Sequence, residues 1–390
     1  MTVLEPRHAE ELPEIRQAVA ELCSRFGGSY WRDLEPDSYP ERFVRELTAQ
    51  GWLGILIPEQ YGGAGLGITA ASVVLEEINS QGGNAAACHA QMYTMGTVLR
   101  HGSDTQKQRW LPQIADGTVR LQAFGVTEPT AGSDTTAITT SAERIAGGWR
   151  LRGQKAFTSR AQHSDLMLLI ARTTPLAEVS RRRDGLSVFL VDLRQAGLQM
   201  TIRPMRTLMN HATTEVFLDG LEVGDEALIG EVGEGFGYIL DGMNAERILI
   251  AAECVGDGHW FVRTAAAYAS NREAFGRAIG ANQGVQFPIA RAYAAVEAAD
   301  LMRWQAAALF DAGQRCGAEA NMAKLLASEA SWQAANACLD THGGWGFAAE
   351  YDVERKFRET RLYLNAPVTN NLVLAFLGQN VLGMPRSYGG

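Results

Sequence analysis

The sequence predicts a mainly helical protein with a central β domain, because the periodicity of its apolar residues changes twice along the chain. Residues 1–120 and 232–390 have apolar positions every three to four residues, as amphipathic helices do. Residues 121–231 contain short runs rich in β-branched and aromatic residues, broken by Gly, Asp and Asn. We therefore expect three domains in a chain of 390 residues, which is longer than one hydrophobic core usually serves.

The first domain, residues 1–120, is predicted to be helical from segments such as PERFVRELTAQ and TAASVVLEEINSQ. Ser103 is a candidate N-cap for the segment DTQKQRWLPQIADG, because its hydroxyl can accept a hydrogen bond from the first helical turn. The motif YGGAGLG at 61–67 lacks dinucleotide-binding spacing, since Ile68 stands where a third glycine is required. We expect a flexible loop there.

The middle domain, residues 121–231, is predicted to form a barrel or sandwich of short strands. The predicted strands are LQAFGVT, GGWRLRGQKAFTS, DLMLLIART, GLSVFLVDL, LQMTIRPM and TTEVFLDGLEV. A basic run, SRRRDG at 180–185, lies between two of them and could attract a phosphate. A solvated loop is the simpler interpretation of such a run, so it receives no site role.

The third domain, residues 232–390, contains helical segments long enough for a bundle. In its first helix, Glu246 and Arg247 interrupt a run of mostly aliphatic and small residues. Burying a carboxylate is costly unless the carboxylate is paired or used. Glu246 is therefore either a catalytic group in a dry pocket or a member of an ion pair in a helix interface.

Composition narrows the classes of partner. The net charge of −9 argues against nucleic acid, and no run of 18 uncharged apolar residues is present to span a membrane. The first twenty residues are rich in Glu and lack an apolar signal core, so we expect a cytoplasmic protein. Five widely spaced cysteines fit reduced thiols, and no histidine has a second ligand at metal-binding spacing. We expect no metal site.

Two loops combine strand ends with hydroxyl groups. FGVTEPTAGSD at 124–134 presents Thr130, Ser133 and Asp134 after a strand, and GQKAFTS repeats the pattern about 20 residues later. Together they could form a shelf for a planar, hydrogen-bonding cofactor. Two ordinary β-turns remain the alternative from the pattern alone.

These segments, taken with NAERILIAAECVG, YASNREAFGRAIGANQGVQ and THGGWGFAAEYDVERKFRETRLY, resemble the acyl-CoA dehydrogenase family in order and spacing from about residue 10 to 380. The resemblance implies an N-terminal helical domain, a middle β-barrel and a C-terminal four-helix bundle. It also implies FAD as cofactor, an acyl-CoA substrate, an electron-transfer flavoprotein as electron acceptor, and a homodimer or homotetramer.

The resemblance also implies site residues. Phe157 and Ser159 match a family motif in which an aromatic ring covers the flavin and a hydroxyl bonds near its N5. Arg272, Phe275 and Gln283 match residues that reach the adenine and pyrophosphate of a neighbouring subunit's FAD. The remaining residues matched to the cofactor are Phe124, Val126, Thr127, Gly132, Ser133, Asp340, Gly343, Gly344, Thr369 and Asn371. Those matched to the substrate are Ser133, Asn244, Arg247 and Pro367.

The catalytic base is implied by elimination within the family. Most members carry a glutamate near the C-terminus, where this chain has Pro367. A minority, such as isovaleryl-CoA dehydrogenase, place the base 26 residues before the FAD-binding arginine, which is Glu246 here. Glu246 is therefore the candidate base, and burial would tune its pKa. Pro367 has no N–H to polarise a thioester carbonyl, so the N–H of Ala366 or Val368 is a candidate substitute.

The implied reaction is α,β-dehydrogenation of the thioester to a trans-2-enoyl-CoA. Glu246 takes the α-proton while the β-hydrogen leaves as hydride to flavin N5. Other outcomes on the same fold stay open: a dehydrogenase that acts on acyl-carrier-protein thioesters, a flavin oxidase or oxygenase, or a non-catalytic partner subunit of a related dehydrogenase.

Overall fold

The computed structural model describes residues 12–386, which fold into two compact units. One unit comprises residues 34–66 and 86–243, and the other comprises the remaining described residues. The division falls inside helix α7 (Gly235–Asn271). A mainly helical chain with a central β part is thus confirmed, whereas the domain boundaries at 120 and 231 stay predictions.

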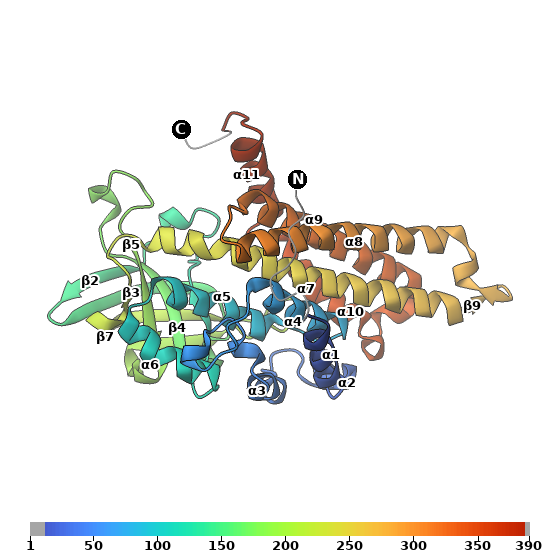
Figure 1. Ribbon diagram of the computed structural model, residues 1–390, viewed down its shortest axis with the longest axis horizontal. Coiled ribbons are helices and arrows are strands. Elements are labelled where there is room, and N and C mark those ends of the chain that lie inside the picture. The colour runs from blue at the N-terminus through green and yellow to red at the C-terminus, as the bar shows by residue number, and fades with distance from the viewer. Residues whose placement is uncertain (1–11, 387–390) are drawn as a thin grey trace. The chain divides into compact units, whose positions relative to one another are not determined.

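The first unit contains one sheet of eight strands (Figure 1). The strands are β1 (Leu121–Gly125), β2 (Ser141–Ile145), β3 (Gly148–Ser159), β4 (Leu166–Arg172), β5 (Leu186–Asp192), β6 (Met200–Pro204), β7 (Thr213–Gly224) and β8 (Leu228–Ile229). Their order is β6-β7-β3-β2-β4-β5-β8, and β1 pairs in parallel with β4. Every strand predicted from the sequence is present. The short strands β2 and β8 were not predicted.

Both faces of the middle of this sheet are buried. Along β4, Leu166 and Leu168 pack with residues of α5 (Ala86–His101) and α6 (Asp104–Ala115), whereas Met167 and Leu169 pack with Trp149 and Phe189 on the other face. Burial on both faces explains why the segment reads as a continuous apolar run. The unit also contains α3 (Glu41–Ala49).

The second unit is helical (Figure 1). Its helices are α1 (Leu12–Cys23), α2 (Gly28–Asp33), α4 (Ile68–Ser80), most of α7, α8 (Gln283–Asp311), α9 (Gly317–His342), α10 (Val353–Arg361) and α11 (Asn370–Phe376). The long helices α8 and α9 pack along each other, and α10 packs on α9. A two-stranded hairpin, β9 (Glu273–Ala274) and β10 (Arg277–Ala278), joins α7 to α8. Cores of Ala, Val and aromatic residues fill the bundle.

A group of charged side chains is buried inside this bundle. Asp257 of α7 is fully buried, and its carboxylate lies 2.5 Å from the Lys356 ammonium of α10. The same ammonium lies 3.2 Å from Glu359 and donates to the carbonyl of Gly83. Burial raises the pKa of Asp257 to about 7, against the attraction of Lys356. Lys356 thus lies between two acidic side chains, of which Glu359 is also paired with the Arg355 guanidinium at 2.8 Å.

The loop at 61–67 is a tight turn. Gly62 has a φ of 85°, and the N–H of Gly65 donates to the carbonyl of Ile57 at 2.8 Å. A Cβ at Gly63 would lie 2.1 Å from that carbonyl oxygen, so only glycine fits there. The prediction of a loop is confirmed, whereas its flexibility stays a prediction, and its glycines serve a close approach of the backbone.

Ser103 caps α6 as the sequence predicted. Its hydroxyl accepts from the N–H of Gln106 at 3.1 Å, and the Gln106 side chain accepts from the N–H of Ser103 at 2.8 Å. Both halves of this capping box satisfy first-turn groups. Replacing Ser103 with Ala is therefore expected to lower the free energy of unfolding by ~1 kcal/mol in urea titrations. A Ser103→Thr variant keeps the hydroxyl as the control, and equal losses in both variants would contradict the capping role.

Two other sequence-based predictions concern the whole chain. Among residues 12–386, no helix is both long and apolar enough to cross a membrane. All five cysteines are buried, and all lie outside disulfide bonds. The prediction about an export signal concerns residues 1–20, of which 1–11 lie outside the described part of the chain.

Candidate functional site

A β-bulge in β3 turns the ring of Phe157 out of the sheet. The pairing between β3 and β7 shifts between Lys155 and Thr158, and Phe157 has a φ of 55°. This φ is strained for an aromatic residue, and its ring is nonetheless 61% exposed. Bulges commonly re-aim a side chain next to a functional site. The strained, exposed ring of Phe157 is thus a candidate platform on which a planar ligand can stack.

The loop after β1 is fastened to β3 beside this ring. The N–H of Ala156 donates to the carbonyl of Thr127 at 2.8 Å. The Lys155 ammonium donates to the carbonyl of Val126 at 3.1 Å and to the carboxylate of Glu128 at 2.9 Å. The segments FGVTEPTAGSD and GQKAFTS therefore lie against each other, as the shelf interpretation required.

The ion pair between Lys155 and Glu128 is almost completely buried. Glu128 also accepts hydrogen bonds from the N–H groups of Thr139 and Thr140. Burial alone would raise the pKa of Glu128, but Lys155 and these donors lower it to about 2. Burial lowers the pKa of Lys155 to about 8, and Glu128 opposes this change. No local sequence pattern indicates this pair, because its members are 27 residues apart.

Other predicted flavin-site residues lie in the same unit as Phe157. Phe124 stands on β1, with its ring 6.0 Å from that of Tyr93. Ser159 ends β3, and its hydroxyl lies 3.0 Å from a ring nitrogen of His211. His211 was not predicted as a site residue.

Gly132 and Ser133 lie on the exposed turn that follows the fastened loop. The neighbouring Asp134 pairs with Arg182 at 2.9 Å. The basic run that received no site role therefore contacts this turn through an exposed ion pair.

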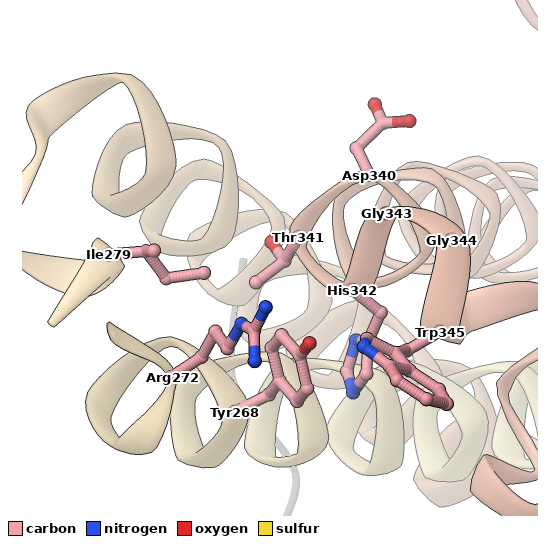
Figure 2. Close-up of a pocket in the computed structure, with 9 residues that line it drawn as sticks. All are labelled: Tyr268, Arg272, Ile279, Asp340, Thr341, His342, Gly343, Gly344 and Trp345. Carbon is pink, nitrogen blue, oxygen red and sulfur yellow. The ribbon is translucent and has the colours of Figure 1, made fainter. Parts of the chain in front are cut away.

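A pocket of about 520 Å³ lies in the helical unit, and Figure 2 shows the nine residues that line it. Arg272, just after α7, lines this pocket together with Gly343 and Gly344, just after α9, and their role in a cofactor site stays a prediction. Neither glycine has an atom within 4 Å of where a Cβ would stand, and Gly343 has a φ of 56°. The backbone is therefore open to close approach by a ligand.

Three aromatic rings of this pocket were not predicted. His342 stacks on Tyr268 at 4.1 Å between ring centroids, and Trp345 is 48% exposed (Figure 2). Burial lowers the pKa of His342. Tyr268 precedes Arg272 by one helical turn, a spacing that could have indicated a shared face. The sequence offered no similar signal for His342 or Trp345.

Only some of the predicted cofactor residues of this unit line the pocket. Asp340 lines the pocket, although Figure 2 shows its carboxylate pointing away from the other labelled side chains. Phe275 and Gln283 are not among the lining residues. Phe275 is fully exposed on the hairpin between α7 and α8, with a strained φ of 52°.

Glu246 is less buried than the sequence predicted. Glu246 was expected to be enclosed, but it is partly exposed to solvent. Its neighbours Asn244 and Arg247 are partly exposed as well. The Arg247 guanidinium donates to the Asn244 side chain at 3.1 Å, and burial lowers its pKa. The enclosed carboxylates of α7 are instead Glu253 and Asp257, because the continuously buried stretch of this helix begins at Ile248.

The segment around Pro367 is held by a buried lysine. The Lys324 ammonium of α9 donates to the carbonyl of Val368 at 2.8 Å and to the Asn370 side chain at 2.6 Å. Thr369 caps α11 by accepting from the N–H of Leu372 at 3.3 Å. Lys324 was not predicted as a site residue.

Asn371, by contrast, is exposed on the first turn of α11. Thr369, which caps this helix, and Asn371 thus lie outside the pocket that contains Arg272.

The chain matches three domain models of one family. The N-terminal domain of acyl-CoA dehydrogenases matches residues 9–118, the middle domain matches 123–221, and the C-terminal domain matches 233–379. The chain belongs to the acyl-CoA dehydrogenase family. It is 36% identical over 384 residues to the acyl-CoA dehydrogenase FadE12 of Mycobacterium tuberculosis, covering 97% of this chain and 98% of that one.

Two further matches are glutaryl-CoA dehydrogenases. The glutaryl-CoA dehydrogenase of Desulfococcus multivorans is 34% identical over 383 residues, 96% of each chain. A solved structure of glutaryl-CoA dehydrogenase in complex with glutaryl-CoA matches with a TM-score of 0.90 at 29% identity, covering 98% of each chain.

Membership in the acyl-CoA dehydrogenase family confirms the predicted class of enzyme, a flavoprotein oxidoreductase that acts on CH–CH bonds, and the predicted cofactor, FAD.

Proposed function

We propose that this acyl-CoA dehydrogenase oxidises the Cα–Cβ bond of an acyl-CoA thioester to the trans-2-enoyl-CoA. The observation that carries the proposal is the Phe157 platform, a strained and exposed aromatic ring beside a loop that Lys155 holds in place. A conformation that costs folding energy is retained where it has a use. A flat isoalloxazine ring is a ligand suited to an exposed aromatic face.

The residues of the helical pocket fit the other half of FAD. Arg272 offers a positive charge and a planar fork of donors that matches phosphate oxygens. Gly343 and Gly344 leave room for the pyrophosphate next to the backbone. Tyr268, His342 and Trp345 offer aromatic faces on which an adenine can stack. FAD supplies the hydride acceptor, and the chain supplies binding, orientation and proton transfer.

Glu246 is the proposed base for the α-proton. A half-buried carboxylate loses its remaining contact with water when the substrate covers it, and this desolvation raises its affinity for the proton that it must take. Arg247 and Asn244, one turn away or less, are proposed to contact the substrate. Pro367 has no N–H, so we propose that the N–H of Val368 or Ala366 polarises the thioester carbonyl.

The exposed Phe275 favours a site completed by a second copy of the chain. A fully exposed ring at a strained φ on a hairpin is costly to keep in water. We therefore propose a homodimer or homotetramer in which Arg272, Phe275 and Gln283 contact the FAD of a neighbouring subunit. We also propose an electron-transfer flavoprotein as the acceptor that reoxidises the flavin.

The proposal is tested by anaerobic titration of the purified, FAD-loaded protein with short, branched and long acyl-CoAs while the flavin absorbance is followed. Bleaching by at least one acyl-CoA, with formation of the enoyl product, is the expected result. No bleaching by any member of the panel would reject the proposal. Oxygen consumption coupled to turnover would indicate an oxidase, and bleaching only by acyl-carrier-protein thioesters would indicate a carrier-linked dehydrogenase.

Replacing Arg272 with Lys is expected to weaken FAD binding roughly ten- to a hundredfold, because the bidentate contact to phosphate is worth about 1.5–3 kcal/mol. The dissociation constant is measured by titrating the apoprotein with FAD and following flavin fluorescence. Arg315→Lys, at an exposed position that we assign no role, is the matched control. Equal affinity of both variants and the wild type would show that Arg272 does not bind the cofactor.

A further inference from the structure

His211 has no role in the proposed reaction, yet it directly contacts Ser159, a residue of the proposed flavin site. Its Nδ1 is 3.0 Å from the hydroxyl oxygen of Ser159, at the end of β3. The two residues are 52 positions apart, so the contact depends on the fold rather than on local sequence. A second polar group next to a hydroxyl that faces the cofactor can decide whether the hydroxyl donates a hydrogen bond to the cofactor or accepts one from it.

The segment that carries His211 is fixed on both sides. The side-chain amide of Asn210 donates to the carbonyl of Leu34 at 2.9 Å and to that of Ser38 at 2.8 Å. On the other side, the carbonyl of Ala212 accepts from the N–H of Arg160 at 2.8 Å. The chain on both sides of His211 is therefore tied to other segments, which limits the positions that its imidazole can take beside Ser159.

The surroundings of the imidazole favour its neutral form. Burial lowers the pKa of His211 well below its ordinary value, and the positive charge of Arg160 and the nearby His89 lower it further. A neutral imidazole has one nitrogen that donates and one that accepts. In a free neutral histidine side chain the Nε2–H tautomer is the more stable one, which leaves Nδ1 as the acceptor.

A serine hydroxyl has a single hydrogen to donate and two lone pairs that accept. If that hydrogen is given to His211, Ser159 can only accept at the flavin edge. Oxidised flavin presents a lone pair at N5, whereas reduced flavin presents an N–H at the same atom. An accepting hydroxyl thus bonds well to the reduced form and poorly to the oxidised form.

We propose that His211 is a positioning residue that accepts the hydrogen of the Ser159 hydroxyl, so that Ser159 presents only lone pairs to the flavin and favours its reduced form. This inference rests on the proposed flavin site, in which Ser159 faces N5. Its consequence is a flavin that is easier to reduce than it would be beside a serine without such a partner.

The test compares two amide variants of the full-length FAD-loaded protein. In His211→Asn the amide oxygen stands near the position of Nδ1 and can still accept from Ser159, whereas in His211→Gln it stands near Nε2 and leaves Ser159 unpaired. The reduction potential is measured by equilibration with a redox dye and a chemical reductant, without acyl-CoA. We expect His211→Gln to disfavour reduction about tenfold, which is about 30 mV lower for a two-electron couple, and His211→Asn to stay near the wild type.

The same pair of substitutions in a Ser159→Ala background is the control. There the two amide variants are expected to have equal potentials, because the hydroxyl through which His211 acts is gone. The proposal is overturned if His211→Gln and His211→Asn shift the potential alike, if neither shifts it, or if the difference persists without the hydroxyl.

Failure of this inference is distinguishable from failure of the proposed function. A wild-type flavin that no acyl-CoA reduces rejects the proposed reaction but leaves the dye measurement intact. A wild-type protein that acyl-CoA reduces, combined with unchanged potentials in both amide variants, rejects only the role of His211.

Discussion

Replacing Glu246 with Gln is expected to slow the reduction of the flavin by acyl-CoA about 10²–10⁴-fold. This is the usual contribution of a positioned general base. Glutamine keeps the size and the polarity of the side chain but cannot accept the α-proton. FAD affinity is expected to be unchanged, since Glu246 is not among the residues proposed to bind the cofactor. The measurement is anaerobic stopped-flow reduction of the bound flavin, with FAD content determined beforehand.

Two further variants test whether the effect of Glu246→Gln is due to loss of the carboxylate at this position. Glu246→Asp retains a carboxylate one methylene shorter, so it is expected to recover part of the rate. Glu350→Gln removes an exposed carboxylate outside the proposed site and is expected to reduce as fast as the wild type. If Glu246→Gln also reduces at the wild-type rate, the base lies elsewhere and Glu246 has only a structural role.

Replacing Lys155 with Met is expected to destabilise the β-containing unit by about 3–5 kcal/mol, because it leaves the buried carboxylate of Glu128 without its counter-charge. The same change removes the donor to the carbonyl of Val126, so the loop beside Phe157 loses its attachment to β3. We expect FAD to be lost at lower denaturant concentrations than in the wild type. Chemical denaturation followed by circular dichroism and by flavin fluorescence measures both effects.

A double-mutant cycle separates the ion pair from general damage to β3. Lys155→Met combined with Glu128→Gln is expected to be less destabilised than the sum of the single changes, since neither partner then remains charged and unpaired. Arg150→Met on the same strand removes an exposed ion pair with Glu222 and is expected to change stability little. Additive effects in the cycle would show that Lys155 and Glu128 do not interact as described.

The pH dependence of this pair follows from the lowered pKa of Glu128. A carboxyl whose pKa is lower in the folded state stabilises the fold fully above its ordinary value, and this contribution is lost as the pH falls towards about 2. The contribution of the Glu128 carboxylate is therefore intact at neutral pH, whereas the Lys155 ammonium loses its charge as the pH rises through about 8.

The strands and long helices were predictable because their apolar patterns repeat locally. Strand β2 was missed since its residues Glu143 and Arg144 are charged and exposed, which hides the alternation. The contacts of Lys155 with Glu128, and of Ser159 with His211, join residues far apart in the chain, so no local pattern could indicate them.

The resemblance to a family implied which residues form the site, but it did not imply how their side chains are oriented or how deeply they are buried. It matched Phe157 to the flavin, but only the pairing of β3 with β7 reveals the bulge that exposes the ring. The expectation that Glu246 is enclosed was wrong for a related reason. Periodicity showed that α7 is covered on several sides, but it could not show that the cover begins beyond Glu246, where Glu253 and Asp257 lie.

The buried charges around Lys356 make folding of the helical unit a proton-binding reaction. Asp257 has an ordinary pKa of 3.8 and a pKa of about 7 inside the bundle, so between these values the folded chain holds a proton that the unfolded chain releases. The stability of the unit therefore falls as the pH rises through this range and levels off above it. The bundle that carries the candidate base is thus most stable in mildly acidic solution, and its heat of unfolding includes the heat of protonating the buffer, which takes up the proton that Asp257 releases.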